Sequence, residues 1–416
     1  MSRFRFVHAA DLHLDSPLLG LSQRSRQFAA RIDDASRRAF DNLIDLTIDE
    51  ECAFIVIAGD LFDGKWRDYR TGLFFADRMR RLKSANIRAF VILGNHDAEN
   101  RFASRLELSE NVHVFSSKKP ETICIDELGV AIHGRSFPQR DVLDNLALAY
   151  PKGDDRYFDI GVLHTACDGR PGHASYAPCT MQQLANHGYD YWALGHVHRH
   201  EILNDSPYIV YPGNLQGRQV RESGPKGGVL VTVDEGKVTE IEHRALDVVR
   251  WLIADTNISE AVNLEAVQGL IRESLAICSD AAGGRSIAVR VRLIGETALH
   301  GNLLKKHSEM YEEVQTLAAD ISPDFWIERL EIDTAEPGLT TPTDPTIAGR
   351  IKSIIHTLAA DPSYAASLEA KLTEIRSKMP AAARAEELFD SLRESIPQRA
   401  LELAVTVIEA REASAR

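Results

Sequence analysis

The sequence predicts an α/β protein: two β-sheets packed on each other with helices outside, then a small α/β domain and a helical C-terminal tail. Three patterns lead to this prediction. From Phe4 to about Ala245, short apolar runs alternate with amphipathic helical segments, which is typical of a layered α/β domain. After Arg250 the order strand, helix, strand, helix, strand follows on a smaller scale, and from Thr346 the pattern is helical. The predicted domains are therefore 1–245, 246–335 and 336–416.

The first domain carries ten predicted strands and one long amphipathic helix. Five runs are almost wholly apolar and are predicted to be buried strands: Arg5–Ala9, Phe54–Ala58, Ala89–Leu93, Ile160–Leu163 and Tyr191–Leu194. Five further strands are predicted at Val112–Phe115, Thr122–Ile125, Val130–His133, Tyr208–Tyr211 and Val229–Val233. Between the first two buried strands, apolar residues recur at helical spacing: Phe28, Ile32, Ala35, Ala39, Leu43 and Leu46.

The second pattern has its own apolar residues and suits a small separate domain. Its strands are predicted at Trp251–Ala254, Ile287–Ile294 and Phe325–Ile332. Its helices are predicted near Leu264–Cys278 and Leu299–Leu317. The following stretch, Thr334–Pro345, is rich in Pro, Thr and Gly and is predicted to be a linker.

Length and composition indicate a globular protein with more than one domain. The 416 residues exceed what one compact core usually holds, and the apolar fraction of 44% is ordinary for a globular chain. No run approaches the roughly 18 apolar residues of a membrane helix, and the first residues lack the apolar core of a signal peptide. We therefore expect a cytoplasmic protein with no membrane contact. The five scattered cysteines contain no CxxC pair and are predicted to be reduced thiols.

The formal net charge of −13 bears on the partners of the protein. Such a charge argues against strong autonomous binding to nucleic acid. Carboxylates that bind metal ions would account for part of it. If the substrate is a polyanion, then local basic patches, metal ions or a partner protein must help to hold it.

Polar motifs stand where predicted strands end, and ligand sites in layered α/β folds gather at such places. The motifs are Asp11-Leu12-His13, Gly59-Asp60-Leu61-Phe62-Asp63, Gly94-Asn95-His96-Asp97, Val162-Leu163-His164 and Gly195-His196-Val197-His198. In an extended segment, residues two apart point the same way, so the D-x-H and H-x-H spacings allow both side chains to reach one ion. A strand-end histidine such as His164 is more often structural when it stands alone, but here it is one element of an ordered set.

The donor set predicts two divalent metal ions. It mixes carboxylate and amide oxygens with imidazole nitrogens and contains no thiolate, which favours Mn²⁺, Fe or Zn²⁺ over Ca²⁺ or Mg²⁺ alone. Two carboxylates, one amide and four imidazoles are too many for one ion, and they suit two ions about 3.5–4 Å apart that share a carboxylate. A G-x-S-x-G elbow is missing from the sequence, which argues against serine hydrolase chemistry.

Together these motifs resemble those of the calcineurin-like metallophosphoesterases. The opening V-H-A-A-D-L-H-L-D-S-P at residues 7–17 is similar to the DNA-repair exonuclease branch of that family, SbcD-like and more narrowly YhaO-like. Supporting stretches are Gly134–Phe137, Tyr211–Leu215 and Gly224–Gly227. The resemblance covers roughly residues 4–245 and implies a four-layer sandwich of two mixed β-sheets flanked by helices, with a small α/β capping domain after it.

Carried over position by position, the resemblance distributes seven ligands over two ions, most often Mn²⁺. The first ion would take two carboxylates and two imidazoles: Asp11, His13, Asp60 and His198. The second would share one of those carboxylates and add an amide and two imidazoles: Asp60, Asn95, His164 and His196. His96 would not be a ligand; it would act as an acid or transition-state stabiliser while a metal-bound hydroxide attacks phosphorus in line.

Four further residues are candidates around the metal ions. In archaeal and eukaryotic relatives of the branch, a second catalytic histidine occupies the position of Asp63, so the balance of exonuclease and endonuclease activity stays open. We predict that Asp63 orients a ligand imidazole, and Asp97 is a second candidate for such a role or for phosphate contact. Arg135 and Arg218 either contact phosphate or form salt bridges with surface carboxylates. His8, inside a strand, is predicted to be packed core.

Three hypotheses for the function remain. The first is Mn²⁺-dependent hydrolysis of DNA phosphodiester bonds, with the small domain shaping access to DNA ends. The second is hydrolysis of a small phosphoester or cyclic nucleotide by the same site, against which residues 246–416 weigh because such enzymes often stop near the end of the first domain. The third is a non-catalytic subunit that binds DNA ends or an ATPase, against which the complete ligand set argues.

The C-terminal helical region bears on partners. Its apolar stripes include Ile351, Ile354, Ile355, Leu358, Leu388, Leu392, Leu401, Leu403 and Val407. Such stripes pack on the protein's own domain or, as the resemblance implies, dock the base of an SMC-like coiled-coil ATPase, SbcC-like or YhaN-like. The sequence has no G-x-x-x-x-G-K-[ST] loop, so an ATP-driven step would need such a partner. Related nucleases are often homodimers.

Overall fold

The structure is a computed structural model, and it describes residues 3–18, 34–63, 69–98, 107–169, 176–337 and 362–378, together with Phe389, Leu392, Arg393, Ile396 and Arg399. By its internal contacts the chain divides into two units. The first unit consists of residues 1–294 and 302–333, and the second of residues 295–301 and 334–416.

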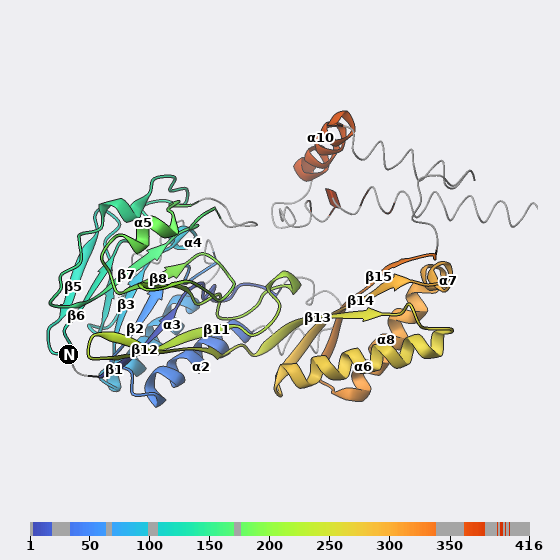
Figure 1. Cartoon of the computed structure of the whole chain (residues 1–416), viewed down its shortest axis with the longest axis horizontal. Helices are drawn as coiled ribbons and strands as arrows, with labels where there is room; N and C mark the ends of the chain where they lie inside the picture. Colours follow the sequence, from blue (N-terminus) through green and yellow to red (C-terminus); the bar gives the residue numbers. More distant parts are fainter. Residues whose placement is uncertain are drawn as a thin grey trace, which may run out of the picture. The chain divides into compact units, whose positions relative to one another are not determined.

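Most of the first unit is built on two six-stranded sheets (Figure 1). The first sheet has the order β12-β11-β1-β2-β3-β4. Its strands are β1 (Phe4–Ala9), β2 (Phe54–Ala58), β3 (Arg88–Ile92), β4 (Val112–Val114), β11 (Gly227–Asp234) and β12 (Lys237–Ala245). Strands β1 to β4 run parallel, whereas β11 pairs antiparallel with both β1 and β12, so the sheet is mixed.

The second sheet has the order β5-β6-β7-β8-β10-β9. Its strands are β5 (Glu121–Ile125), β6 (Val130–Gly134), β7 (Phe158–His164), β8 (Tyr191–Gly195), β9 (Glu201–Asp205) and β10 (Tyr208–Tyr211). Strands β6, β7, β8 and β10 are parallel, and the edge strands β5 and β9 are antiparallel to their neighbours. The parallel strands thus occupy the centre of the second sheet, whereas in the first sheet they extend from β1 to the edge strand β4.

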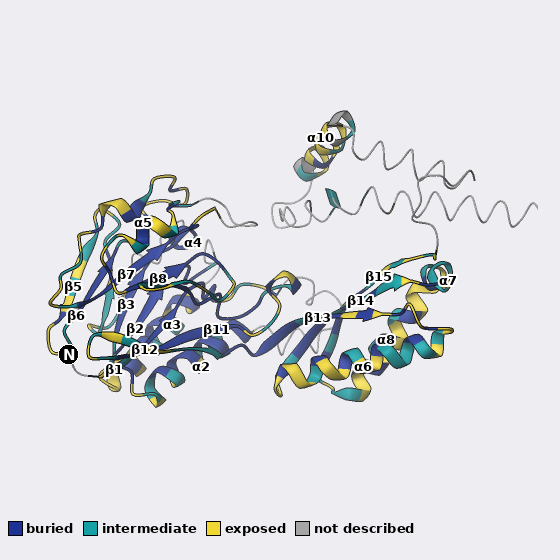
Figure 2. Ribbon diagram, viewed as in Figure 1, coloured by how far each residue is buried: buried dark blue, intermediate teal, exposed yellow. Residues whose placement is uncertain are grey.

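The sheets pack face to face with helices on their outer faces. One core, between the sheets, contains alternate strand residues such as Phe6, Phe54 and Val162. A second core joins the other face of the first sheet to helices α2 (Ala35–Asp49) and α3 (Arg70–Ser84), and a third joins the second sheet to α5 (Met181–Ala185) and the 3-10 helix η2 (Leu146–Ala149). The central strands are accordingly buried along their length (Figure 2). The predicted four-layer sandwich is confirmed.

A three-stranded sheet with the order β13-β14-β15 also belongs largely to the first unit. Its strands are β13 (Val249–Asn257), β14 (Ser286–Glu296) and β15 (Phe325–Ala335), with α6 (Leu264–Ala282), α7 (His300–Lys305) and α8 (His307–Ile321) between them. The side chain of Asn263 caps α6 by accepting a hydrogen bond from Ala266 N, and Gly283 ends the helix in the left-handed region. The helix predicted at Leu299–Leu317 is two helices, with a break at Lys306.

The predicted strands of both regions are present, and two edge strands, β9 and β12, were not predicted. Both are partly exposed, so their apolar alternation is weak. The linker prediction at Thr334–Pro345 is wrong at its start, because β15 extends through Ala335, and residues 338–345 lie outside the described residues. Phe28 and Ile32 also lie outside them, as do the stripe residues of the tail except Leu392. Within the tail the structure describes one helix, α10 (Pro362–Lys378).

Two further observations concern cysteines and membranes. All five cysteines are free thiols. Within the described segments, helices long and apolar enough to span a membrane do not occur.

Candidate metal centre

The five motifs meet at one end of the sandwich, because each follows the carboxyl end of a parallel strand: β1, β2, β3, β7 and β8. Hydrogen bonds between the loops after β1 and β2 hold this end together. Asp11 N donates to Gly59 O (3.0 Å) and His13 N to Asp60 O (3.1 Å). Three predicted ligands on these loops, Asp11, His13 and Asp60, have φ values between 42° and 52°, and His196 has a φ of 100°. Such left-handed conformations cost energy and concentrate at functional sites.

Glycines before the ligands allow a close approach, between two loops of one sheet at Gly94 and between the two sheets at Gly195. A Cβ on Gly94 would lie 2.2 Å from Oδ1 of Asp60. A Cβ on Gly195 would lie 1.9 Å from the carbonyl oxygen of Ala58 on the facing sheet. Real Cβ atoms do not approach oxygens so closely, so only glycine fits at either position without a shift of the backbone.

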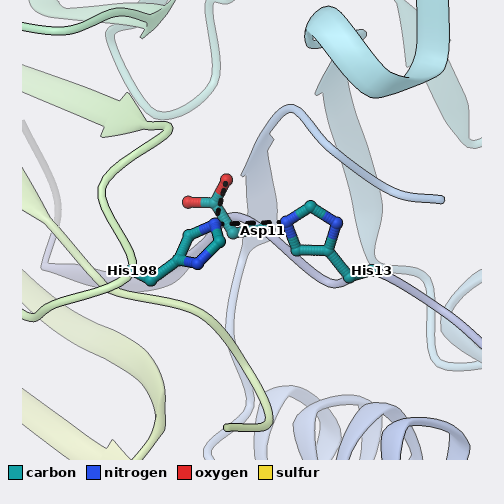
Figure 3. A group of neighbouring side chains, drawn as sticks. All are labelled: Asp11, His13 and His198. Carbon is teal, nitrogen blue, oxygen red and sulfur yellow. Dashed lines mark hydrogen bonds and ion pairs between the residues drawn. The ribbon is translucent and has the colours of Figure 1, made fainter. Parts of the chain in front are cut away.

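The first group of side chains consists of Asp11, His13 and His198 (Figure 3). Nε2 of His13 and Nε2 of His198 face each other at 3.2 Å, and Oδ1 of Asp11 lies 3.9 Å from Nε2 of His198. Nδ1 of His198 lies 2.8 Å from a carboxylate oxygen of Glu222, so Nδ1 carries the proton and Nε2 presents a lone pair. Nδ1 of His13 has no hydrogen-bond partner among the described residues. Two imidazoles and a carboxylate in this arrangement fit a shared divalent cation.

The second group centres on the fully buried imidazole of His164. Its Nδ1 donates to the carbonyl oxygen of Ala58 (2.9 Å), so in the neutral imidazole the lone pair lies on Nε2, which is 3.0 Å from Oδ1 of Asn95 and 3.5 Å from Oδ2 of Asp60. A lone pair facing two oxygens calls for a positive charge between them. Burial opposes the protonated imidazole, yet the charge and hydrogen bond of Asp60, with help from Asp11, raise the pKa of His164 to about 9. A cation bound between Nε2 and these oxygens would supply the same positive charge.

Asp60 lies where the two groups meet. It forms one set of neighbouring donors with Asp11 and His164 and another with His13 and His96. The backbone N–H of His96 donates to its Oδ1 (3.0 Å). Burial opposes its ionisation, but the surrounding imidazoles, His164 first, hold the pKa of Asp60 well below its usual range. An ionised carboxylate in this position suits a ligand shared by two ions.

His196 lies at the same end of the sandwich and contacts the other motif residues through its backbone and its ring. Its backbone N–H donates to both carboxylate oxygens of Asp11, at 3.2 and 3.0 Å. Its ring lies 5.2 Å from that of His164, centroid to centroid, and 5.7 Å from that of Tyr176. Burial raises the pKa of Asp11 despite the nearby imidazoles, so an added cation would stabilise its carboxylate.

The predicted catalytic histidine is held by Asp63. Nδ1 of His96 lies 3.3 Å from Oδ1 of Asp63, and the Ser16 hydroxyl donates to the other oxygen (2.9 Å). Burial opposes the charged form of His96, but Asp63 and Asp60 raise its pKa. Burial likewise opposes ionisation of Asp63, while His96, His13 and Arg218 hold its pKa below the usual range. Asp63 and His96 therefore behave as an ion pair beside the two groups.

Asp97 fastens two motif loops together. Its carboxylate accepts hydrogen bonds from the backbone N–H groups of Leu61 (3.1 Å), Phe62 (3.0 Å) and Gly94 (2.9 Å). Burial and the charge of Asp60 raise its pKa to about 7. These contacts orient the loops that carry Asp60 and Asn95.

The two arginines differ in position. Arg218 lies beside the first group: its Nη2 is 3.2 Å from Oε1 of Glu222, and its Nη1 is 3.9 Å from Oδ1 of Asp63. Nε of Arg135 instead donates to Ser117 O (3.3 Å), in the loop between β4 and β5. His8 is buried between Tyr191 and Leu194, as predicted for a core residue.

Sequence reasoning did not identify Glu222 and Lys226 as parts of the centre. Glu222 contacts Nδ1 of His198, and Nζ of Lys226 donates to the carbonyl oxygen of the same histidine (2.6 Å). Both lie more than twenty residues further along the chain than His198 and share no motif with it. Two features of the sequence could have indicated them: the spacing of Arg218 and Glu222, which form an i,i+4 ion pair, and the stretch Gly224–Gly227, which contains Lys226.

The comparisons with known proteins agree with this geometry. The profile of the calcineurin-like phosphoesterases matches residues 4–200, and that of the middle domain of metallophosphoesterase YhaO matches residues 251–335. The "Uncharacterized metallophosphoesterase YhaO" of Bacillus subtilis is 35% identical over 359 residues, which cover 84% of this chain and 86% of that protein. The chain therefore belongs to the calcineurin-like metallophosphoesterases, which supports a metal-dependent phosphoester hydrolase.

More distant relatives include archaeal proteins. "DNA double-strand break repair protein Mre11" of Methanopyrus kandleri is 27% identical over 267 residues, which cover 57% of this chain and 56% of that protein. Its counterpart in Archaeoglobus fulgidus is 26% identical and covers 71% of each chain. Among solved structures, a dimetal phosphatase from Danio rerio is 13% identical with a TM-score of 0.37, covering 56% of this chain and 93% of that one.

Proposed function

We propose that this chain is a two-metal-ion nuclease that hydrolyses phosphodiester bonds in DNA. The observation that carries the proposal is the fixed orientation of two imidazoles. Nδ1 of both His198 and His164 contacts a hydrogen-bond acceptor, and both Nε2 atoms face other candidate metal ligands. This arrangement supports metal chemistry. The choice of DNA is supported by the archaeal relatives, whose names place them in double-strand break repair.

Seven residues would hold the ions, which in our proposal are Mn²⁺, with Fe or Zn²⁺ as alternatives. One ion would lie among Asp11, His13, Asp60 and His198. The other would lie among Asp60, Asn95, His164 and His196. When bound, such ions activate a water molecule and neutralise charge on the phosphoryl oxygens.

The residues beside the ions would handle the proton and the phosphate. Asp63 lies against Nδ1 of His96, so Nε2 is the atom left to donate a proton to the leaving alkoxide. The raised pKa of His96 keeps it protonated at a higher pH than a free histidine. Arg218, half-buried between Glu222 and Asp63, would add a positive charge for the phosphate. His96 would thus act as a proton donor and the other imidazoles as metal ligands, because their ring nitrogens contact different groups.

The rest of the chain would control the access of DNA to the metal ions and the assembly with partner proteins. We assign residues 1–245 to the catalytic domain, 246–335 to a capping domain that shapes access to DNA ends, and 336–416 to the linker and helical tail. In our proposal the tail docks an SMC-like coiled-coil ATPase, and the protein acts as a homodimer in the cytoplasm. A partner of this kind would also help to hold DNA against the net charge of −13.

The test is cleavage of end-labelled single- and double-stranded DNA by the purified protein, with Mn²⁺ or with EDTA. We expect manganese-dependent cleavage, lowered about 10²–10⁴-fold in His96→Ala because general acid catalysis is lost. His307→Ala, an exposed histidine of α8, is the matched control and should cleave normally. A protein that hydrolyses bis-p-nitrophenyl phosphate but leaves DNA intact would keep the metal chemistry and overturn the DNA substrate.

A further inference from the structure

We propose that Glu222 is a positioning residue of the metal centre, which holds His198 and Arg218 in their working orientations. The inference rests on the proposed metal site and concerns only the half of it that contains His198. Glu222 lies on the 3-10 helix η3 (Val220–Glu222), outside every motif that carries a predicted ligand.

Four donors converge on the Glu222 carboxylate. Oε1 lies 2.8 Å from Nδ1 of His198 and 3.2 Å from Nη2 of Arg218. Oε2 accepts from Nδ2 of Asn214 (2.9 Å) and from the backbone N–H of Arg218 (2.7 Å). Both oxygens therefore act only as acceptors, which an ionised carboxylate can do and an amide cannot, because its NH₂ group would face two donors.

The carboxylate remains charged although it is buried. Burial opposes ionisation, but the hydrogen bond from His198 and the charge of Arg218 hold the pKa of Glu222 well below its usual range. A buried charge that satisfies four donors is costly to remove from its partners and costly to replace with a neutral group. The orientation of the donors around it is accordingly fixed.

For His198, the consequence is a single tautomer. With Nδ1–H directed at Glu222, the neutral imidazole presents the lone pair of Nε2, which faces Nε2 of His13 at 3.2 Å. Nζ of Lys226 also holds the carbonyl oxygen of His198 (2.6 Å), so the side chain and the backbone of this ligand are both fixed from the segment 214–226. A histidine that presents Nε2 in this way needs no rearrangement before it binds a cation.

The segment 214–226 is anchored on its other side by the first residues of β13. Nε1 of Trp251 donates to Gly217 O (2.9 Å), and Gly224 N donates to Trp251 O (2.8 Å). The side chain of Gln216 donates to Val249 O (2.7 Å) and accepts from Val248 N (2.8 Å). Contacts on both sides of Glu222 thus tie it to buried main chain, which gives it the rigidity that a positioning residue needs.

The two halves of the centre give the inference a specific signature. His164 is oriented by a main-chain carbonyl, Ala58 O, and not by Glu222. Loss of the Glu222 carboxylate should therefore weaken the ion at His198 and leave the ion at His164 unchanged. A general loss of structure would weaken both.

The experiment is calorimetric titration of Mn²⁺ into the metal-free, full-length protein and its Glu222→Gln variant. We expect two sites in the unmodified protein, and in the variant a loss of about 10–100-fold in affinity at one of them, as for other groups that orient metal ligands. Glu260→Gln, at an exposed position, is the matched control and should bind as the unmodified protein does. If Glu222→Gln bound Mn²⁺ as the unmodified protein does, or lost affinity equally at both sites, the inference would be overturned. An unmodified protein that binds no ion would overturn the proposed function instead.

A second measurement does not depend on the folding of that variant. Nitrogen-15 spectra of histidine-labelled, metal-free protein report the tautomer of each imidazole, and comparison with His198→Gln assigns the signal of interest. We expect the Nδ1–H tautomer at His198. An Nε2–H tautomer there would show that Glu222 does not orient the ring and would overturn the inference.

Discussion

The two halves of the proposed metal centre are oriented by different parts of the molecule. His164 lies at the end of the buried strand β7, and a carbonyl oxygen of the facing strand β2 fixes its ring. His198 lies in a loop, with 17% of its side chain exposed, and Glu222 on the segment 214–226 fixes its ring. The first half is thus a product of sheet packing, whereas the second depends on side chains brought together from separate loops.

This difference teaches which changes each half should tolerate. The half at His164 is held by main-chain contacts in a core, so it should lose its metal affinity only when the packing of that core is disrupted. The half at His198 is held by a buried carboxylate and its donors, so the loss of a single side chain should lower its metal affinity while the sheets stay intact. The following predictions separate the two cases.

The largest effect is expected from His164→Ala compared with His198→Ala. Each substitution removes a proposed ligand, so each should lower Mn²⁺ affinity at one site by more than the roughly 10–100-fold loss typical of groups that only orient a ligand. Only His164→Ala should also lower the free energy of unfolding of the metal-free protein strongly, by about 2–5 kcal/mol, because it opens a cavity in a fully buried site. Calorimetry and urea unfolding measure the two quantities. Equal losses of stability in both variants would contradict the contrast.

The next prediction concerns the pH dependence of stability without metal. The pKa of His164 is raised to about 9, above its usual value of 6.5, so its contribution to stability is complete below about pH 6.5 and is lost as the pH rises through 9. Between about pH 7.5 and 9, above the range in which Asp97 titrates with its pKa of about 7, the urea midpoint in EDTA should fall. His198→Ala, which keeps His164, should show the same decrease, and His164→Gln should not. Added Mn²⁺ should stabilise the protein more at the higher pH, since a proton no longer competes for Nε2.

A smaller effect is expected at Asp63, which lies outside both halves. Asp63→Asn removes the hydrogen bond and the charge that raise the pKa of His96, so that pKa should fall. If protonated His96 donates to the leaving group, the alkaline limb of the pH–rate profile should move to lower pH, with a loss of rate of about 10-fold at neutral pH. Metal stoichiometry should stay at its original value. If the pH–rate profile of Asp63→Asn kept the same alkaline limb as that of the unmodified protein, Asp63 would not set the protonation of His96.

The same contrast explains what the sequence could predict. The strands that carry the centre are nearly continuous apolar runs, so β1, β2, β3, β7 and β8 were all predicted close to their bounds. The motifs follow those strands directly, and parallel strands bring their carboxyl ends to one edge. The half of the centre at His164 depends on little else, apart from the carbonyl of Ala58, which any strand would provide.

The half at His198 depends on contacts that have no periodic signal. Glu222 and Lys226 approach His198 only because the chain returns through β10 and the segment 214–226. Apart from its i,i+4 spacing from Arg218, nothing local distinguishes Glu222 from the other carboxylates of a chain with 61 acidic residues. The two edge strands escaped prediction for a related reason: β9 and β12 are partly exposed, and their apolar alternation is weak.

The smallest effect is expected at Trp251, the anchor of the segment 214–226. Trp251→Phe keeps a buried aromatic ring but leaves Gly217 O without its hydrogen bond, which should cost about 1–3 kcal/mol of stability. Because Gly217 lies five residues before Glu222, affinity for Mn²⁺ at His198 should fall by less than in Glu222→Gln, while affinity at His164 should not change. Trp326→Phe, at a half-buried position of β15, is the matched control. If Trp251→Phe weakened neither site, the segment 214–226 would not transmit the position of β13 to His198; if it weakened both sites equally, the two halves of the centre would share a common support.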